Sequence, residues 1–375
     1  MHQVDIAIVG AGIAGASLAY RIAGKRNVVL LEREAQPGMH TTGRSAALFE
    51  ETYGPPAARA LTRASHDFYA QPPAGFCDVP LLAPRGLLYV ANHEQAALLA
   101  QLRDELRPHC PELEDWSAEA AVTRVPVLRP ASVLAALWEP RASDIDVHAL
   151  LHGFLRGARL GGAELRCNAG LVSARHDGSA WVLLLTDGSA LRAGVVVNAA
   201  GAWVDEVAAA CGAKPIGIVP KRRSAFTFAA PAGMAVAHWP CVIGADESYY
   251  FKPDAGRLLG SPANADAMHP HDVMPEEMDI AQGIHQIEAA TTMQIRRPTS
   301  TWAGLRSFVA DGELVIGPDD ACPGFFWLAG QGGYGIQSAA AASELAAALL
   351  CGQALPEGLA RHGVDAGAMS VQRLR

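Results

Sequence analysis

Three glycines and one acid near the N-terminus have the types and spacing of a nucleotide-binding site. Gly10, Gly12 and Gly15 form a GxGxxG turn after an apolar run, and Glu32 stands 22 residues after Gly10. In such a turn the first glycine permits a tight bend, the second admits a pyrophosphate, and the third allows close helix packing. An acid at this spacing accepts hydrogen bonds from ribose hydroxyls. The pattern predicts a dinucleotide site rather than a turn that binds nothing.

These residues need a βαβ unit to position them. The run from Asp5 to Val9 predicts a buried strand, and a helix beginning near Ile13 would direct its unpaired N–H groups at the phosphates. Residues 28–31, all Val or Leu, predict the next parallel strand, which ends at Glu32. Strand, glycines, helix and acid therefore occur in the required order.

Composition limits the partners of the chain. With 375 residues it is long enough for two or more modules, and half of its residues are hydrophobic. The formal net charge is -8, and no run of five like charges occurs, so nucleic acid is excluded as a partner and a small molecule is expected.

The cysteines and the N-terminus predict a cytoplasmic protein. The seven cysteines are scattered without CxxC spacing, as expected for reduced packing thiols, and no metal site is predicted. A strand that starts near residue 4 leaves no room for a signal peptide, and no apolar run reaches the roughly 18 residues of a membrane span.

A polar, glycine-punctuated stretch at residues 38–47 leads into an aromatic and acidic stretch that ends at Gly54-Pro55-Pro56. This profile is typical of an active-site loop, with lid motion as an open question.

The remaining pattern predicts two interleaved domains in an α/β protein. Helices are predicted at 56–69, 94–106, 147–160 and 336–350, and strands at 85–91, 164–168, 171–175, 180–185, 195–198 and 325–329. A mainly antiparallel β-rich insert is predicted at 216–300. The resulting division is a Rossmann-like nucleotide domain of residues 1–80, 145–215 and 301–375, and a substrate domain of residues 81–144 and 216–300.

Five segments together resemble one family. They are GAGIAG at 10–15, LEREAQPG at 31–38, TGRSAA at 42–47, NAAGAW at 198–203 and GQGGYGIQ at 330–337. The chain resembles the FAD-dependent amine and D-amino-acid oxidoreductases related to D-amino-acid oxidase, glycine oxidase and sarcosine oxidase. Within them it is most similar to the bacterial D-arginine dehydrogenases. The resemblance runs from end to end and implies non-covalent FAD rather than NAD.

The resemblance also implies which residues line the flavin nucleotide. They are Gly10, Gly12, Ile13, Ala14, Gly15, Glu32, Arg33, Thr41, Thr42, Gly43, Arg44, Ser45, Ala46, Ala47, Leu48, Val172, Ala200, Gly201, Gly332, Gly333, Tyr334, Gly335, Ile336 and Gln337. For Leu48 and Val172, ordinary packing is an equal alternative.

Four further residues match the family's substrate-binding positions. Arg223 and Arg306 match carboxylate-binding arginines, and Tyr53 and Tyr250 match substrate-contacting tyrosines. Oxidation of an amino acid requires a neutral amine, a Cα–H aimed at flavin N5 and a held carboxylate, for which a planar guanidinium is suited. Arg306 lies in an apolar run, where burial requires an anionic partner. A solvated basic edge is the alternative for Arg223.

Two positions depart from the D-arginine dehydrogenase pattern. Leu87 stands where those enzymes have an acid for the substrate guanidinium, and Leu48 stands where they have a histidine. With Glu50, these leucines are predicted to form the side-chain pocket, and the loss of two polar groups predicts a preference for neutral, apolar D-amino acids.

The predicted reaction transfers a hydride from the α-carbon of a D-amino acid to flavin N5. The imino acid formed hydrolyses to a 2-oxo acid and ammonia. Three alternatives stay open: a D-arginine or D-lysine dehydrogenase served by Glu50, Glu51, Asp246 or Glu247; an oxidase of N-methylated or other secondary amines; and a nucleotide-binding protein without redox turnover. The electron acceptor is open, with a quinone as one candidate, and a monomer is expected.

Overall fold

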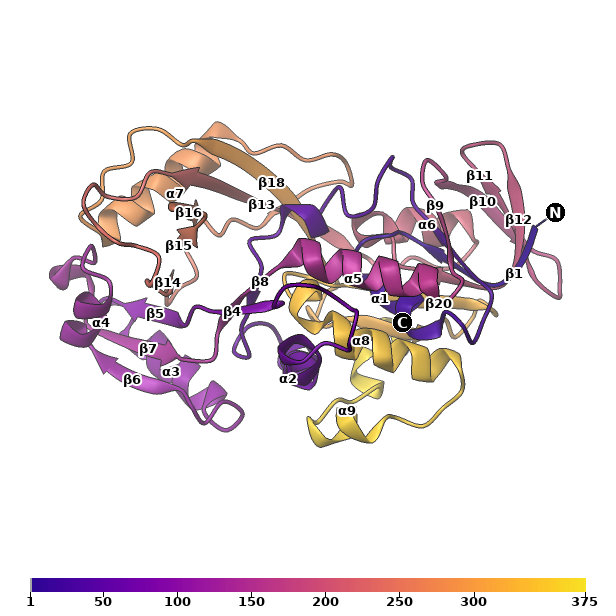
Figure 1. The fold of residues 1–375 in the computed structure, drawn as a ribbon, viewed down its shortest axis with the longest axis horizontal. Coiled ribbons are helices and arrows are strands. Elements are labelled where there is room, and N and C mark those ends of the chain that lie inside the picture. Colours follow the sequence, from indigo (N-terminus) through magenta and orange to yellow (C-terminus); the bar gives the residue numbers. More distant parts are fainter. Residues whose placement is uncertain (1) are drawn as a thin grey trace.

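The computed structural model describes residues 2–375 and contains two large β-sheets in two lobes (Figure 1). One sheet is a Rossmann-like layer packed with helices, and the other is mainly antiparallel. The predicted α/β fold is confirmed. No helix within the described residues is both long and apolar enough to span a membrane.

The first sheet is built around β1 (His2–Val9), which pairs in parallel with β2 (Val28–Leu31) on one side and β12 (Ala190–Asn198) on the other. The other strands are β9 (Glu164–Arg166), β10 (Leu171–His176), β11 (Trp181–Leu185), β19 (Val315–Pro318) and β20 (Phe325–Ala329). Strand β20 also runs parallel to β12, so β12 lies between the N-terminal strand β1 and the C-terminal strand β20.

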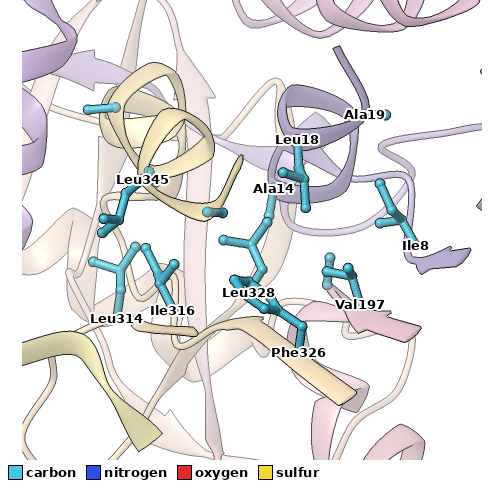
Figure 2. Close-up of a cluster of buried hydrophobic side chains, with 14 of the residues drawn as sticks. Ile8, Ala14, Leu18, Ala19, Val197, Leu314, Ile316, Phe326, Leu328 and Leu345 are labelled. Atoms are coloured by element: carbon cyan, nitrogen blue, oxygen red, sulfur yellow. The ribbon is translucent and has the colours of Figure 1, made fainter. Parts of the chain in front are cut away.

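Alternate residues of β1 bury both faces of this sheet. Ile8 points to a core closed by α1 (Ile13–Ile22) and α8 (Gly335–Leu350), where Leu18 and Leu345 pack (Figure 2). Val9 points to the opposite core, which includes α6 (Val204–Ala210). Burial on both faces explains why these strands are uninterrupted apolar runs.

The second sheet has nine strands and holds the other lobe together. Its strands are β5 (Leu87–Ala91), β6 (Glu114–Ser117), β7 (Ala135–Glu139), β13 (Val219–Phe228), β14 (Cys241–Gly244), β15 (Tyr250–Asp254), β16 (Arg257–Ser261), β17 (Asp266–Ala267) and β18 (Ser300–Phe308). A small third sheet joins β3 (Leu48–Phe49), β8 (Ser143–Ile145) and β4 (Leu82–Pro84) between the lobes.

The remaining helices cover these sheets. They are α2 (Pro56–Ala70), α3 (Ala96–Leu106), α4 (Ala118–Arg124), α5 (Val147–Leu160), α7 (Glu277–Ala290) and α9 (Glu357–Arg361). Short 3-10 turns occur at Thr42–Arg44, Pro130–Ser132, Gly201–Trp203, Gly367–Met369 and Val371–Leu374.

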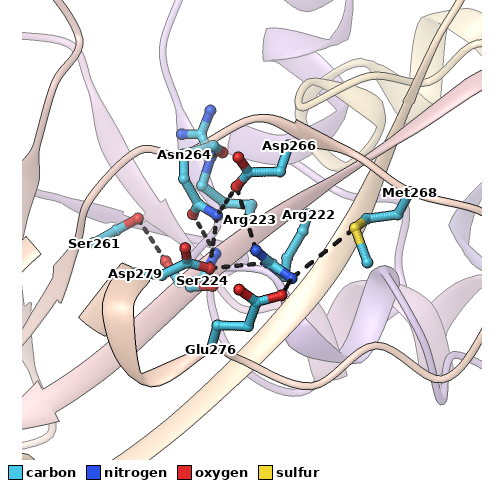
Figure 3. A network of polar contacts seen from close by, with 9 residues as sticks. All are labelled: Arg222, Arg223, Ser224, Ser261, Asn264, Asp266, Met268, Glu276 and Asp279. Carbon is cyan, nitrogen blue, oxygen red and sulfur yellow. Dashed lines mark hydrogen bonds and ion pairs between the residues drawn. The ribbon is translucent and has the colours of Figure 1, made fainter. Parts of the chain in front are cut away.

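The pairing of β13 with β18 divides two neighbouring arginines between opposite faces. Arg223 lies opposite Gly304 and Arg306 lies opposite Lys221, so both arginines project from one face. Arg222 projects from the other face, where its Nε lies 2.9 Å from the carboxylate of Asp279 on α7 (Figure 3). Because side chains alternate between the two faces of β13, the ion pair of Arg222 with Asp279 lies on one face and Arg223 lies on the other.

Two features differ from the expectations. The predicted boundary at 300/301 cuts β18 after its first residue, whereas the whole strand belongs to the second sheet, because its main-chain groups pair with β13 over its full length. The insert at 216–300 contains α7, which the β-rich pattern did not predict.

The third glycine of the N-terminal turn provides a test of this packing. A Cβ on Gly15 would lie 1.9 Å from the carbonyl oxygen of Gly10, and neither backbone segment can move away without opening the turn. We expect Gly15→Ala to lower the free energy of unfolding by about 3 kcal/mol or more. Thermal unfolding by calorimetry or circular dichroism measures the effect.

Gly358 is the matched control because it lies in helix α9 with no atom within 4 Å of the added Cβ. Gly358→Ala should be neutral or stabilise by up to about 1 kcal/mol. Equal unfolding temperatures of the two variants would contradict the packing argument.

Candidate active site

A continuous trough of three cavities runs along the carboxyl ends of β1, β2 and β12 and into the second lobe. The outer cavity is about 750 Å³, the middle one about 110 Å³ and the inner one about 60 Å³. Gly12 and Gly201 line both the outer and the middle cavity, whereas Arg223 and Arg306 line both the middle and the inner cavity. Ligand sites lie at this edge of a sheet in Rossmann-like folds.

The outer cavity begins at the glycine turn. Gly10 has a φ of +106°, and a Cβ there would lie 2.4 Å from the carbonyl oxygen of Ala199. Glu32 lines this cavity, where its two carboxylate oxygens accept from the N–H groups of Ala11 and Glu34, each at 3.0 Å. The first turn of α1 contains no acidic residue, so the positive end of the helix dipole is available to an anion.

Aromatic and cationic side chains lie at the outer end of this cavity. The guanidinium of Arg33 is 4.8 Å from the ring of Trp203, and the imidazole of His40 is 4.7 Å from the same ring. Trp203 and His40 were not predicted from the sequence as cofactor contacts. Trp203 is the last residue of the NAAGAW segment, so the sequence did contain an indication of its role. Such a platform fits a planar base.

Most of the predicted cofactor residues line the outer and middle cavities. These are Gly10, Gly12, Ile13, Ala14, Glu32, Arg33, Thr41, Thr42, Arg44, Ser45, Ala46, Val172, Ala200, Gly201, Gly332, Gly333, Gly335 and Ile336. Ala47, Leu48 and Gln337 line only the inner cavity.

Three predicted cofactor residues do not line these cavities. Gly15 and Gly43 act through packing, since a Cβ on Gly43 would lie 2.5 Å from the carbonyl oxygen of Gly38. Tyr334 is 2 % exposed and packs against Tyr53 and the core below it. Arg44 lines the middle cavity, but its Nη1 donates to the carbonyl oxygens of Val273 and Ala303 at 2.9 and 3.2 Å. These four support the shape of the trough.

The loop at 38–47 is fixed to β18 by two further hydrogen bonds, besides the one from Arg44 to the carbonyl oxygen of Ala303. Thr41 Oγ1 donates to the carbonyl oxygen of Leu305 at 2.6 Å, and Trp302 Nε1 donates to the carbonyl oxygen of Arg44 at 3.1 Å. The loop therefore holds its position relative to the strand that carries Arg306.

All four predicted catalytic residues meet at the inner cavity, which also receives Tyr89 from β5. Arg306 Nη1 donates to the Tyr53 hydroxyl at 2.8 Å, and Arg223 Nε donates to the carbonyl oxygen of Asn264 at 2.7 Å. Tyr250 comes from β15 and is 8 % exposed. The residues come from four separate segments, which only the folded chain brings together.

The two arginines have no carboxylate within ion-pair distance among residues 2–375. Burial lowers the pKa of Arg223 to about 10, and the positive charge of Arg306 adds to this effect. An incoming carboxylate would offset the burial of these charges and the repulsion between them, and it could accept hydrogen bonds from both guanidinium groups. The inner cavity therefore has the charge and the donor groups to bind an anion.

Gly333 leaves the space that this pair needs. A Cβ there would lie 2.5 Å from the Tyr53 hydroxyl and 2.9 Å from Arg306 Nη1. Glycine at this position allows the loop before α8 to approach the anion site closely.

A carboxyl group lies on the other side of the same cavity. Glu50 is 8 % exposed, and burial, together with the charges of Glu139 and Glu247, raises its pKa to about 8. Glu139 lies deeper, and burial raises its pKa to about 7 although Thr52 Oγ1 donates to it at 2.5 Å. The inner cavity thus contains cationic and acidic groups on different walls.

The expected place of Leu87 in the side-chain pocket requires a correction. Leu87 is fully buried, pairs with Cys241 and Glu139, and does not line the cavity. Tyr89, two residues further on the same face of β5, lines it instead. Leu48 lines the cavity as predicted, and Ile243 and Ala263 add apolar walls that the sequence did not indicate.

Comparison with known proteins places these cavities in a family context. Residues 5–349 match the family model DAO, described as FAD dependent oxidoreductase. The chain is 25% identical over 390 residues to 4-methylaminobutanoate oxidase (formaldehyde-forming) of Paenarthrobacter nicotinovorans, which covers 99% of this chain and 46% of that protein. It is 25% identical over 355 residues to the glycine oxidase of Geobacillus kaustophilus, with 89% of each chain covered.

A third relative, the mitochondrial dimethylglycine dehydrogenase of Rattus norvegicus, is 28% identical over 271 residues, which is 69% of this chain and 31% of that protein. The chain thus spans less than half of the length of 4-methylaminobutanoate oxidase and about a third of dimethylglycine dehydrogenase.

Solved structures share the fold. The glycine oxidase structure from Geobacillus kaustophilus has a TM-score of 0.85 at 22% identity and covers 100% of this chain and 99% of that one. L-alpha-glycerophosphate oxidase from Mycoplasma pneumoniae, solved with FAD bound, has a TM-score of 0.84 at 17% identity and covers 94% and 95%.

The raised pKa of Glu50 predicts how stability depends on pH. Because the folded state binds this proton more tightly than the unfolded state, the contribution of Glu50 is fully present below about pH 4 and is lost as the pH rises towards 8. We expect Glu50→Gln to stabilise the protein relative to wild type by a few kcal/mol at pH 9 and by much less at pH 5.

Thermal unfolding measured at both pH values tests this expectation. Glu94→Gln removes an exposed carboxylate that does not line the inner cavity and is the control, with an expected change of no more than about 0.5 kcal/mol. A difference between Glu50→Gln and wild type that stays constant from pH 5 to pH 9 would contradict the burial argument.

Proposed function

Because this chain belongs to the DAO family of FAD-dependent oxidoreductases, we propose that it catalyses the oxidative deamination of D-amino acids. The family match covers most of the chain and confirms the predicted FAD cofactor and an oxidoreductase activity. The amino-acid substrate and its D configuration go beyond this match. Non-covalent attachment of the flavin is part of the proposal.

The observation that carries the proposal is the pair of buried arginines without an acidic partner. Arg223 and Arg306 line the middle and the inner cavity together, and the Tyr53 hydroxyl is already bound to Arg306. A guanidinium binds both oxygens of a carboxylate in a fixed orientation, which a point charge does not. The site therefore suits a substrate with a carboxylate next to the reacting carbon.

The outer and middle cavities fit FAD. The glycine turn and the N-terminus of α1 would hold the pyrophosphate, Glu32 would accept from the ribose hydroxyls, and Ser45 and Ala46 would line the flavin ring with the loop at 332–336. When bound, FAD accepts a hydride at N5 from the substrate α-carbon.

The protein residues orient the substrate for this transfer. Arg223 and Arg306 would hold the carboxylate, and Tyr53 and Tyr250 would close the cavity around the α-carbon. Enclosure excludes water while the amine nitrogen donates its lone pair to form the imine. Hydrolysis of the imino acid then gives a 2-oxo acid and ammonia.

Oxidation of an N-methylated amino acid is the second candidate. It is favoured by the likeness to 4-methylaminobutanoate oxidase and dimethylglycine dehydrogenase, whose names describe N-methylated substrates. The arginine pair would serve such a substrate equally well, because only the substituent on nitrogen differs.

Side-chain preference depends on the far wall of the inner cavity. Leu48, Ile243 and Ala263 give apolar surface, which supports the proposed use of apolar D-amino acids. Glu50 adds a carboxyl group to the same wall. Because a carboxylate can pair with a cationic side chain, D-arginine and D-lysine stay alternative substrates. A quinone as electron acceptor, a monomeric state and a cytoplasmic location stay predictions from the sequence.

An anaerobic reduction screen of the yellow holoenzyme tests the proposed function. Mixing with D-amino acids should bleach the visible absorbance of the flavin, whereas L-amino acids and sarcosine should leave it unchanged. Bleaching by sarcosine but by no D-amino acid would favour the second candidate. A colourless protein that binds NAD tightly would overturn both.

The arginine pair makes a quantitative prediction. We expect Arg306→Met and Arg223→Met each to lower kcat/KM for the best D-amino acid by about 100-fold or more, because a buried carboxylate loses a charged partner. Stopped-flow flavin reduction under anaerobic conditions measures this loss. Arg257→Met, at an exposed position of β16, is the control and should retain wild-type kcat/KM and FAD content.

A further inference from the structure

Glu50 lies at the inner end of the trough, beyond the outer and middle cavities that fit FAD. It lines the inner cavity but not the middle one, whereas Arg223 and Arg306 line both. A substrate whose carboxylate is held by these arginines and whose α-carbon faces the flavin must extend its side chain into the part of the cavity that Glu50 shares with Tyr89 and Ile243.

The carboxyl group of Glu50 has no partner there. Its Oε2 is buried and makes no hydrogen bond, although the main-chain oxygen of Glu50 accepts from Gln337 Nε2 at 3.1 Å. A buried carboxylate without a donor is unfavourable, and because Glu50 lines a cavity, a ligand group in that cavity can supply the missing donor.

The charged and titratable groups around Glu50 are already engaged or carry the same charge. Arg306 on β18 donates to the Tyr53 hydroxyl at 2.8 Å, and Lys252 on β15 lies 2.6 Å from Asp144. The remaining groups that face it are Glu139 on β7, Tyr89 on β5 and Glu247 in the loop before β15. No cation among residues 2–375 forms an ion pair with Glu50, although the charges of Arg306 and Lys252 act on it from a longer distance and oppose the rise in its pKa.

We propose that Glu50 selects the substrate side chain by charge, binding a cationic side chain when it is ionised and admitting a neutral one when it is protonated. The inference rests on the proposed function and names its substrate classes: basic D-amino acids at higher pH, and neutral ones over a wider range.

The choice between cationic and neutral side chains depends on pH because it depends on whether Glu50 is protonated. Burial raises the pKa of Glu50 to about 8, so the acid is largely protonated at neutral pH. A guanidinium or ammonium group that enters the cavity favours the ionised form, and the proton leaves to solvent as the pair forms. A neutral side chain provides no such compensation and leaves the proton in place. Binding of a cationic substrate is therefore coupled to the release of one proton.

D-arginine and D-citrulline are the matched substrates for the test. They have nearly the same shape, and only D-arginine carries a side-chain charge, which does not titrate below about pH 12. Titration of the α-amine affects both alike and largely cancels in the ratio of their kcat/KM values. We expect this ratio to rise about tenfold per pH unit below pH 8 and to level off above it.

Two variants test whether Glu50 causes the rise of this kcat/KM ratio with pH. In Glu50→Gln the ratio should be at least tenfold lower at pH 9 and should no longer depend on pH. Glu247→Gln removes the other acid that lines the inner cavity; the rise with pH should persist in this variant but shift to lower pH, because the charge of Glu247 helps to raise the pKa of Glu50. A rise that disappears in Glu247→Gln and persists in Glu50→Gln would overturn the assignment.

Calorimetry on the wild-type holoenzyme keeps the proposal testable should Glu50→Gln not fold. We expect 5-guanidinopentanoate, which lacks an α-amine, to release close to one proton on binding at pH 7, and its neutral ureido analogue to release none. Equal proton release by both, or a D-arginine to D-citrulline ratio that is flat with pH in wild type, would overturn the inference while leaving D-amino-acid oxidation intact. Failure of every D-amino acid to reduce the flavin would instead overturn the proposed function.

Discussion

Two guanidinium groups buried in one cavity without a carboxylate partner impose the constraint on which the rest of the site depends. Like charges at short range repel strongly in a medium of low dielectric constant, so Arg223 and Arg306 stay close only because the structure holds them. The β13–β18 ladder sets their backbone positions, and Tyr53 and the carbonyl oxygen of Asn264 each accept one hydrogen bond. An anion that binds beside both guanidinium groups would relieve this repulsion, which is the physical basis of the proposed preference for a carboxylate.

Local sequence patterns predicted the nucleotide-binding part of the structure well. The turn from Gly10 to Gly15, the acid at Glu32 and the strands beside them depend on contacts between residues near in sequence, and glycine spacing reports such contacts directly. Helix α5 was predicted with its observed bounds, because a strong amphipathic period and the Asp146 cap define both its burial and its start.

The substrate part was less predictable because its walls come from long-range strand pairing. Tyr89 lines the inner cavity and Leu87 does not, although both point to the same side of β5. Which of the two reaches the cavity depends on how β5 is placed beside β14 and β7. Helix α7 was missed for a similar reason. Its hydrophobic period is weak, and a tertiary contact, the ion pair of Asp279 with Arg222, helps hold it in place.

The order of strands in the first sheet has a consequence for how the chain folds. β1 pairs with β12, whose residues are some 190 positions away, and β12 pairs in turn with β20 near residue 325. Such high contact order slows folding, and during synthesis β1 waits for β12, which in turn waits for β20. Until then the apolar faces of these strands stay exposed, so the sheet that is buried on both sides in the folded protein is the part of the nascent chain most prone to aggregation.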